Sequence, residues 1–153
     1  MISIECREIS KIFRSPRGDT EALRSVSFTA ADHEFVCIVG SSGSGKTTLL
    51  KILARVLEPT AGEVVLRSAN GSAPRNALVF QEHGLFPWMT VLENVAFGLE
   101  MQGVARRDRT DAAHCFIRKV GLDGYSKKYP YELSVGMRQR VALARAFVSN
   151  AQI

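Results

Sequence analysis

The chain contains 153 residues, of which 46% are hydrophobic and 8% aromatic, as in a soluble globular protein with room for one domain and its own core. No apolar run approaches the ~20 residues of a bilayer-spanning helix, which excludes such a helix from this sequence. The cysteines are odd in number, widely spaced and never arranged as CxxC, which argues against a zinc site or a disulfide framework.

The net charge of +5 is a modest basic excess. Its densest cluster, Arg106, Arg107 and Arg109, is interrupted by Asp108 and Asp111, which favours a solvated helix start over a nucleic-acid-binding patch. We therefore expect no nucleic-acid partner.

The first half of the chain has the alternating and apolar runs of β-strands, separated by turn residues. We expect strands at 2–13, 22–30, 34–39, 63–67 and 77–80, the one at 34–39 being buried. A helix is expected at 47–57, where Pro59 and Gly62 lie in the segment that ends it.

From Val91 onward the hydrophobic period changes from about 2 to about 3.6 residues, as in amphipathic helices. Helices are predicted at 91–101, closed by Gly103, at about 112–120, and at about 136–148. Strands therefore come first, and helices cluster in the later part of the chain.

A phosphate-binding loop follows the 34–39 strand. The pattern GxxxxGK[ST] is matched by Gly40, Ser41, Ser42, Gly43, Ser44, Gly45, Lys46 and Thr47. Its glycines let backbone N–H groups wrap a phosphate, and the positive end of the next helix adds to the attraction. Lys46 would reach the β- and γ-phosphates of a nucleoside triphosphate, and the Thr47 hydroxyl would ligate Mg²⁺. A Gly/Ser turn would match this motif by accident in roughly one such chain in several hundred.

Two later segments select among P-loop proteins. Residues 79–91, with Gln81, resemble the Gln loop of ATP-binding cassette (ABC) ATPases, and residues 133–140, with Ser134 and Gly136, resemble their LSGGQ-type signature. Gln81 lies 35 residues after Lys46, and Ser134 lies 53 residues after Gln81, which also fits that family. These segments argue against a kinase or a GTPase. Within the family, 79–91 and 95–100 look most like bacterial importers of nitrate, sulfonates or taurine.

The resemblance implies an α/β fold: an incomplete P-loop NTPase core with an N-terminal antiparallel β-subdomain and a helical subdomain. The β-subdomain and P-loop core would occupy about 1–84 and the helical subdomain about 85–135. The signature helix and a return to the truncated core would occupy about 136–153.

The resemblance also assigns roles. Gln81 would contact Mg²⁺ or the attacking water, and Ser134 and the amides beside Gly136 would touch the γ-phosphate of an opposing subunit. Phe13 would stack on adenine, and Thr48 joins the P-loop residues that bind ATP. Simpler interpretations remain open: Gln81 as an ordinary polar strand end, Ser134 as a helix N-cap, and Phe13 as a strand-end core residue.

Three neighbouring residues allow two interpretations. Phe86, Pro87 and Trp88 are either local core or part of the surface that receives the permease. His83, by contrast, is interpreted as a loop residue, because the switch histidine of the family lies downstream of residue 153.

Two departures from the family pattern matter. Val135 stands where the commonest signature has glycine, and a β-branched side chain resists a positive φ and crowds a phosphate. The strand that ends in Asp-Glu, the D-loop and the switch histidine are all absent from these 153 residues. We therefore expect weak ATP binding with hydrolysis near background, together with uncovered apolar surface that lowers solubility.

The function that the resemblance implies is the ATP-binding subunit of a bacterial ABC importer, with ATP and Mg²⁺ as cofactors. Its partners would be a second ATP-binding subunit in a head-to-tail dimer, a membrane permease and, indirectly, a periplasmic solute-binding protein. It would sit on the cytoplasmic face of the inner membrane. Alternatives are a non-enzymatic module that binds ATP or caps a full-length partner, and a decayed gene product.

Overall fold

A computed structural model of the chain describes residues 2–68, 74–80 and 84–153. Within it the chain forms two compact units. Unit 1 comprises the residues up to Leu78 together with Gln152–Ile153, and unit 2 comprises Val79–Ala151. Each unit has its own hydrophobic core and is described by itself.

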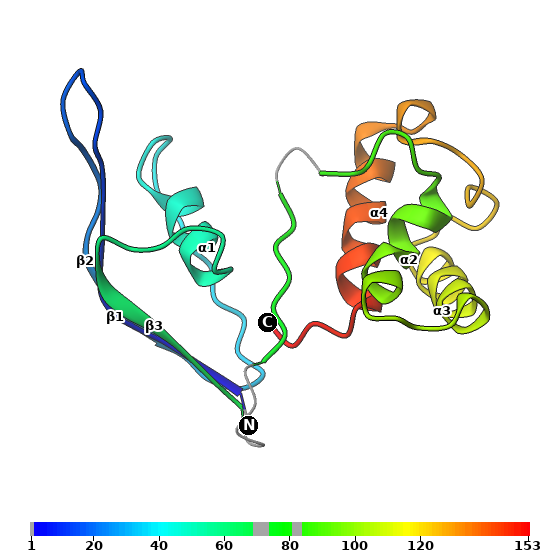
Figure 1. The fold of residues 1–153 in the computed structure, drawn as a ribbon, viewed down its shortest axis with the longest axis horizontal. Helices are drawn as coiled ribbons and strands as arrows, with labels where there is room; N and C mark the ends of the chain where they lie inside the picture. The colour runs from blue at the N-terminus through cyan, green and yellow to red at the C-terminus, as the bar shows by residue number, and fades with distance from the viewer. Residues whose placement is uncertain (1, 69–73, 81–83) are drawn as a thin grey trace. The chain divides into compact units, whose positions relative to one another are not determined.

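Unit 1 is built on an antiparallel sheet of three strands in the order β2-β1-β3. The strands are β1 (Ile2–Phe13), β2 (Thr20–Ala30) and β3 (Ala61–Ser68). Figure 1 shows β1 and β2 as one long hairpin, with β3 along the other edge of β1. The strands at the positions of 2–13, 22–30 and 63–67 are therefore confirmed, the second beginning at Thr20 and the third running from Ala61 to Ser68.

One helix packs on this sheet. Helix α1 (Lys46–Leu53) buries Leu49 and Ile52 against Cys6, Ile9 and Leu23 of β1 and β2. The helix is shorter than the predicted 47–57, because the chain turns out of the helical region directly after it. Arg55 has a φ of 57°, and the N–H groups of Val56 and Leu57 both donate to the carbonyl oxygen of Lys51.

Two predicted strands are wrong. Residues 34–39 and 77–80 are extended but belong to no sheet among the described residues. Phe35 is 90% exposed and Val39 is 88% exposed, so the 34–39 segment is not buried either. The apolar sequence alone cannot make a strand, because a strand also needs a neighbour to satisfy its backbone hydrogen bonds.

Unit 2 is helical. It contains α2 (Val91–Met101), α3 (Arg106–Lys119), a 3₁₀ turn η1 (Pro130–Glu132) and α4 (Val135–Val148). The helices pack together around a core that includes Val95, Ile117 and Val141. All three predicted helices are confirmed, although α3 begins at Arg106, at the arginine cluster, and not at 112. No helix among the described residues is long and apolar enough to cross a membrane.

Candidate functional site: a phosphate-binding loop and a signature helix

The phosphate-binding motif forms an exposed loop between the 34–39 segment and α1 in unit 1. Gly43 and Gly45 have φ values of 78° and 88°, a region that only glycine enters without strain. Gly45 precedes the first residue of α1 and provides no side-chain cap, and the first turn of the helix holds no acidic residue. The helix N-terminus therefore faces the loop with its positive end uncompensated by a carboxylate, as an anion site requires.

A close approach between the loop and the sheet explains why Gly45 is required. A Cβ atom there would lie 2.3 Å from the carbonyl oxygen of Ala22 and 2.9 Å from Cδ2 of Leu23, both on β2. The hairpin therefore packs directly behind the turn into α1. Any larger residue would push α1 away from the core that Leu49 and Ile52 form with the sheet.

The Lys46 side chain folds back over the loop. Its Nζ donates to the carbonyl oxygens of Gly40 at 2.9 Å and Ser41 at 2.6 Å, and it lies 3.2 Å from Oγ of Ser44. The ammonium group is thus held by the first two residues of the loop. Thr47 is exposed in the first turn of α1 and Thr48 is half-buried behind it.

Phe13 ends β1 in the same unit, at the turn of the hairpin. It pairs with Thr20, is 43% exposed, and has Nζ of Lys11 at 5.5 Å from its ring centroid. The ring is therefore partly accessible and does not belong to the unit 1 core. Its stacking on adenine stays a prediction.

The signature segment lies in unit 2. Ser134 is the N-cap of α4, where its Oγ accepts a hydrogen bond from the N–H of Met137 at 3.3 Å. Ser134 and Gly136 are both exposed, and a Cβ on Gly136 would meet nothing within 4 Å. Since the first turn of α4 also has no acidic residue, this helix presents a second uncompensated positive end.

Val135 does not distort the signature backbone. It is the first residue of α4, its φ is not positive, and its side chain is exposed. The conflict between a β-branched side chain and a left-handed backbone therefore does not arise at this position.

Gln81 and His83 lie outside the described residues. The segment that follows them, residues 84–90, is held by a buried asparagine. Asn94 on α2 is fully buried, and its Oδ1 accepts a hydrogen bond from the N–H of Phe86 at 2.8 Å. Its Nδ2 donates to the carbonyl oxygens of Phe86, Met89 and Thr90 at 2.9 to 3.1 Å. One side chain thus makes four hydrogen bonds to the backbone of this turn.

The two aromatic residues of this turn differ in their exposure. Phe86 packs on Phe97 of α2, with ring centroids 4.6 Å apart, while Trp88 is 69% exposed. The sequence had offered local core or a partner surface for Phe86, Pro87 and Trp88. Phe86 is half-buried against Phe97 but lies outside the unit 2 core, and a partner surface stays a prediction for the exposed Pro87 and Trp88.

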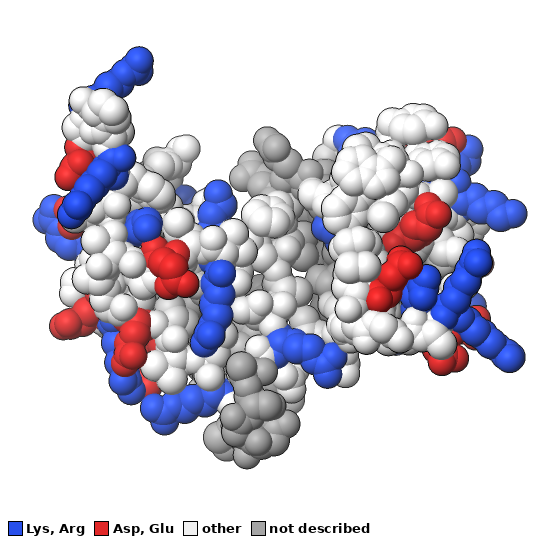
Figure 2. Space-filling view, viewed as in Figure 1, with Lys and Arg blue, Asp and Glu red and all other residues white. Residues whose placement is uncertain are grey.

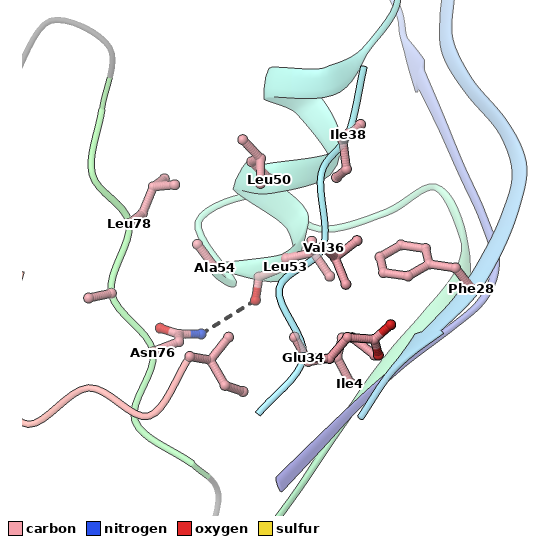
Figure 3. A pocket seen from close by; sticks show the side chains of 13 residues that line it. Ile4, Phe28, Glu34, Val36, Ile38, Leu50, Leu53, Ala54, Asn76 and Leu78 are labelled. Atoms are coloured by element: carbon pink, nitrogen blue, oxygen red, sulfur yellow. Dashed lines mark hydrogen bonds between the residues drawn. The ribbon is translucent and has the colours of Figure 1, made fainter. Parts of the chain in front are cut away.

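An apolar groove of about 340 Å³ opens in unit 1 beside the P-loop segment. Figure 3 shows Val36 and Ile38 of the 34–39 segment and Leu50 and Leu53 of α1 facing it, with Leu78 across the opening. The segment 75–77 borders the groove and pairs with the last residue of the chain. The N–H of Ile153 donates to the carbonyl oxygen of Arg75 at 3.2 Å, and the N–H of Ala77 donates to that of Ile153 at 2.9 Å. This is the hydrogen-bond pattern of a parallel bridge.

Charge does not single out a further site. On the face shown in Figure 2, lysine and arginine side chains are interspersed with aspartate and glutamate on each unit. No group of three or more His, Cys, Asp or Glu residues that could hold a metal ion occurs among the described residues. Cys6 is buried, where burial raises the pKa of its thiol, while Cys37 and Cys115 are exposed free thiols.

The structure thus places Phe13 and the P-loop residues in unit 1, and Ser134 and Gly136 in unit 2. Residues missed by sequence reasoning are Asn94 and Arg145, which hold the 84–90 turn. Position 94 lies on the apolar stripe of α2 with Val91 and Val95, and a polar residue there was a usable signal. Arg145 offered none, because an arginine near a helix end is common.

A loop of this kind before a helix, joined to a helical unit with an N-capped signature helix, defines a nucleotide-binding cassette. The sequence matches the ABC transporter family profile over residues 23–153, so the chain belongs to that family.

Among its relatives, the chain is 41% identical over 152 residues to the nitrate import ATP-binding protein NrtD of Synechocystis sp.. It is 42% identical over 152 residues to the taurine import ATP-binding protein TauB of Burkholderia pseudomallei. The alignments cover 98% of this chain but 57% and 58% of those proteins, so the chain spans little more than half their length.

The fold agrees with solved cassettes. The dimeric structure of the bacterial ABC transporter cassette MJ0796 matches with a TM-score of 0.87 and 30% identity, covering 97% of this chain and 70% of that one. A post-hydrolysis state of the same cassette, bound to ADP and Pi, matches with a TM-score of 0.86 and 29% identity. The predicted α/β cassette fold and the family assignment are confirmed.

Proposed function

We propose that this chain binds MgATP through the loop 40–47 and belongs to the ATP-binding subunit of an importer for nitrate or for a sulfonate such as taurine. The observation that carries the proposal is the geometry of the loop. Positive-φ glycines precede α1, the helix has no acidic residue in its first turn, and the Lys46 ammonium group contacts the loop backbone. The names of the relatives, which import nitrate and taurine, support the importer class and this choice of solutes.

Each binding residue would have a defined task. The Lys46 ammonium would exchange its contacts with loop carbonyls for the β- and γ-phosphates, a stronger charge-assisted interaction. The exposed Thr47 hydroxyl would ligate Mg²⁺, with Gln81 as a further oxygen donor. This donor set fits Mg²⁺, because phosphates and water complete the octahedral shell that the ion prefers. Thr48 and the loop amides would bind phosphate, and Phe13 would stack on the base.

The second half of the site would come from another subunit. Ser134 and the N–H groups beside Gly136 form an exposed helix N-terminus, which suits the γ-phosphate of an opposing nucleotide. The dimeric state of the related MJ0796 cassette supports the pairing of two subunits, and the head-to-tail arrangement is part of the proposal. Docking on a permease at the cytoplasmic membrane face, and indirect service to a solute-binding protein, are proposals for the whole protein.

Hydrolysis is likewise a proposal for the whole protein. The residues that would activate water in this family do not occur within these 153 residues.

Binding of a fluorescent ATP analogue to the purified chain, with and without Mg²⁺, tests the proposal. Lys46→Ala is expected to weaken binding at least tenfold, because a charge-assisted phosphate contact is worth about 1.5–3 kcal/mol. Lys51→Ala is the matched control, since it removes the same charge from the last turn of the same helix. Equal affinity in the wild type, Lys46→Ala and Lys51→Ala chains would refute a site in this loop.

A further inference from the structure

Arg145 makes contacts that the proposed site does not use. It lies in the last turn of α4, and its Nη1 donates to the carbonyl oxygen of Gly84 at 2.9 Å. Its guanidinium carbon also lies 5.6 Å from the centroid of the Phe86 ring, within cation–π range. Burial lowers the pKa of this guanidinium, although an arginine stays charged at any physiological pH. A half-buried charge therefore contacts two residues of one turn.

The same turn is fixed from its other side. Asn94 of α2 bonds the backbone of Phe86 and Met89, and Phe97 of α2 packs on the Phe86 ring. The 84–90 turn is therefore clamped between two helices, by an amide from α2 and by a guanidinium from α4. Neither helix alone provides all of its hydrogen bonds.

Helix α4 is itself well anchored. Val141, Ala144 and Val148 are buried in the unit 2 core, so the helix moves as a body with that core. Its N-terminus carries Ser134, and its last turn carries Arg145. A shift of the signature helix would consequently pull on the carbonyl of Gly84, three residues after Gln81 in the sequence.

We infer that Arg145 is a positioning residue that ties the signature helix α4 to the turn following Gln81, through the Gly84 carbonyl and the Phe86 ring. Its importance for nucleotide chemistry rests on the proposed function. There, α4 would offer Ser134 to an opposing nucleotide while Arg145 holds the turn that leads back to the subunit's own nucleotide. Arginine suits the task, because its planar fork donates in one direction and stacks in another, whereas lysine provides a single point charge.

The experiment is amide hydrogen exchange of the full chain, followed by peptide for 84–90, for α3 and for the sheet. Arg145→Met keeps much of the length and removes the charge, and Arg145→Lys keeps the charge alone. Arg140→Met is the matched control, because Arg140 is on the same helix and donates to the carbonyl oxygen of Val120 at 3.0 Å. Phe86→Leu removes the stacking partner and leaves the Gly84 carbonyl in place.

Arg145→Met should raise exchange in 84–90 by roughly tenfold, the effect of losing a hydrogen bond to a charged group. The peptides of α3 and the sheet should be unchanged. Arg145→Lys should restore only part of the protection, and Arg140→Met should leave 84–90 at the wild-type rate. Emission of Trp88, the only tryptophan in the chain, gives an independent signal from the same turn.

Unchanged exchange of 84–90 in Arg145→Met, or an equal rise in Arg140→Met, would overturn the inference. So would full rescue by lysine, since the fork and the stacking would then be irrelevant. If Arg145→Met fails to fold, the Arg145→Lys and Phe86→Leu chains carry the same comparison. Affinity for the ATP analogue is measured separately on the wild type. Failure of the wild type to bind the analogue would refute the proposed function but would not affect the exchange result on Arg145.

Discussion

Replacing Asn94 by alanine tests how the turn that follows Gln81 is held. The change removes the partner of the Phe86 N–H and of the Met89 carbonyl. The carbonyls of Phe86 and Thr90 keep other donors, the N–H groups of Met89 and Asn94. Two groups are therefore orphaned. Each costs about 1–3 kcal/mol, and the lower part of that range applies because Phe86 and Met89 are only half-buried.

The free energy of unfolding of unit 2 should fall by about 2–3 kcal/mol. Urea unfolding of the full chain measures it, with Trp88 as the reporter because this single tryptophan lies in unit 2. With a slope of about 2 kcal/mol per molar urea, the midpoint should fall by about 1 M or more. Far-ultraviolet circular dichroism, which reports on both units, should show no change in the urea midpoint at which the unit 1 sheet unfolds.

The matched control is Gln139→Ala, which deletes an exposed amide from another helix of unit 2 and should change stability by less than about 0.5 kcal/mol. Asn94→Asp adds a second comparison. It retains an oxygen to accept from Phe86 but points another at carbonyl oxygens, so it should also destabilise. A loss below about 0.5 kcal/mol in Asn94→Ala would refute the view that this side chain organises the turn.

Four further outcomes are expected. Thr90→Ala should cost about 1 kcal/mol of unit 2 stability by Trp88-detected unfolding, because it deletes the N-cap of α2; an unchanged midpoint would contradict it. The backbone N–H and the hydroxyl of Thr90 hold the pKa of Glu93 below its usual 4.5. The stabilising contribution of the Glu93 carboxylate is therefore present above pH 4.5 and is lost as the pH falls through the lowered pKa. The free energy of unfolding, measured from about pH 3 to 7, should depend less on pH in Glu93→Gln than in the wild type. Phe13→Leu should weaken binding of the ATP analogue by about 1–3 kcal/mol if the ring stacks on adenine, while Phe35→Leu, at a second exposed phenylalanine, should not. The double variant Phe35→Ser/Val39→Ser should raise the concentration at which the chain aggregates, as measured by light scattering. If the 34–39 segment is the main apolar patch, Trp88→Ser should raise that concentration by a smaller amount.

Features that depend on local sequence were predictable. The apolar period and Gly103 predicted α2 and the end of α3, and the turn residues after Phe13 predicted the hairpin. The P-loop was also predictable, because Gly45 meets both a local need, its φ of 88°, and a packing need against Ala22.

What failed was what depends on a distant partner. Residues 34–39 and 77–80 have the composition of strands, but strand pairing is decided by a neighbour that no local pattern reveals. The start of α3 was missed for a related reason. Its first turn, from Arg106, holds polar residues, so the apolar period used to find the helix becomes visible only further on.

The candidate site also contains residues that local sequence predicts and residues that it does not. The residues that would touch nucleotide stand out in the sequence, because phosphate binding needs glycines, a lysine and hydroxyls at fixed spacing. The residues that hold those elements in place do not, because any helix can carry an asparagine or an arginine. Asn94 and Arg145 become visible only when the turn between them is seen, with its backbone bonded to α2 on one side and to α4 on the other. Local sequence therefore identifies the residues that would bind phosphate. The residues that position them are identified only by contacts between helices, which form when the chain folds.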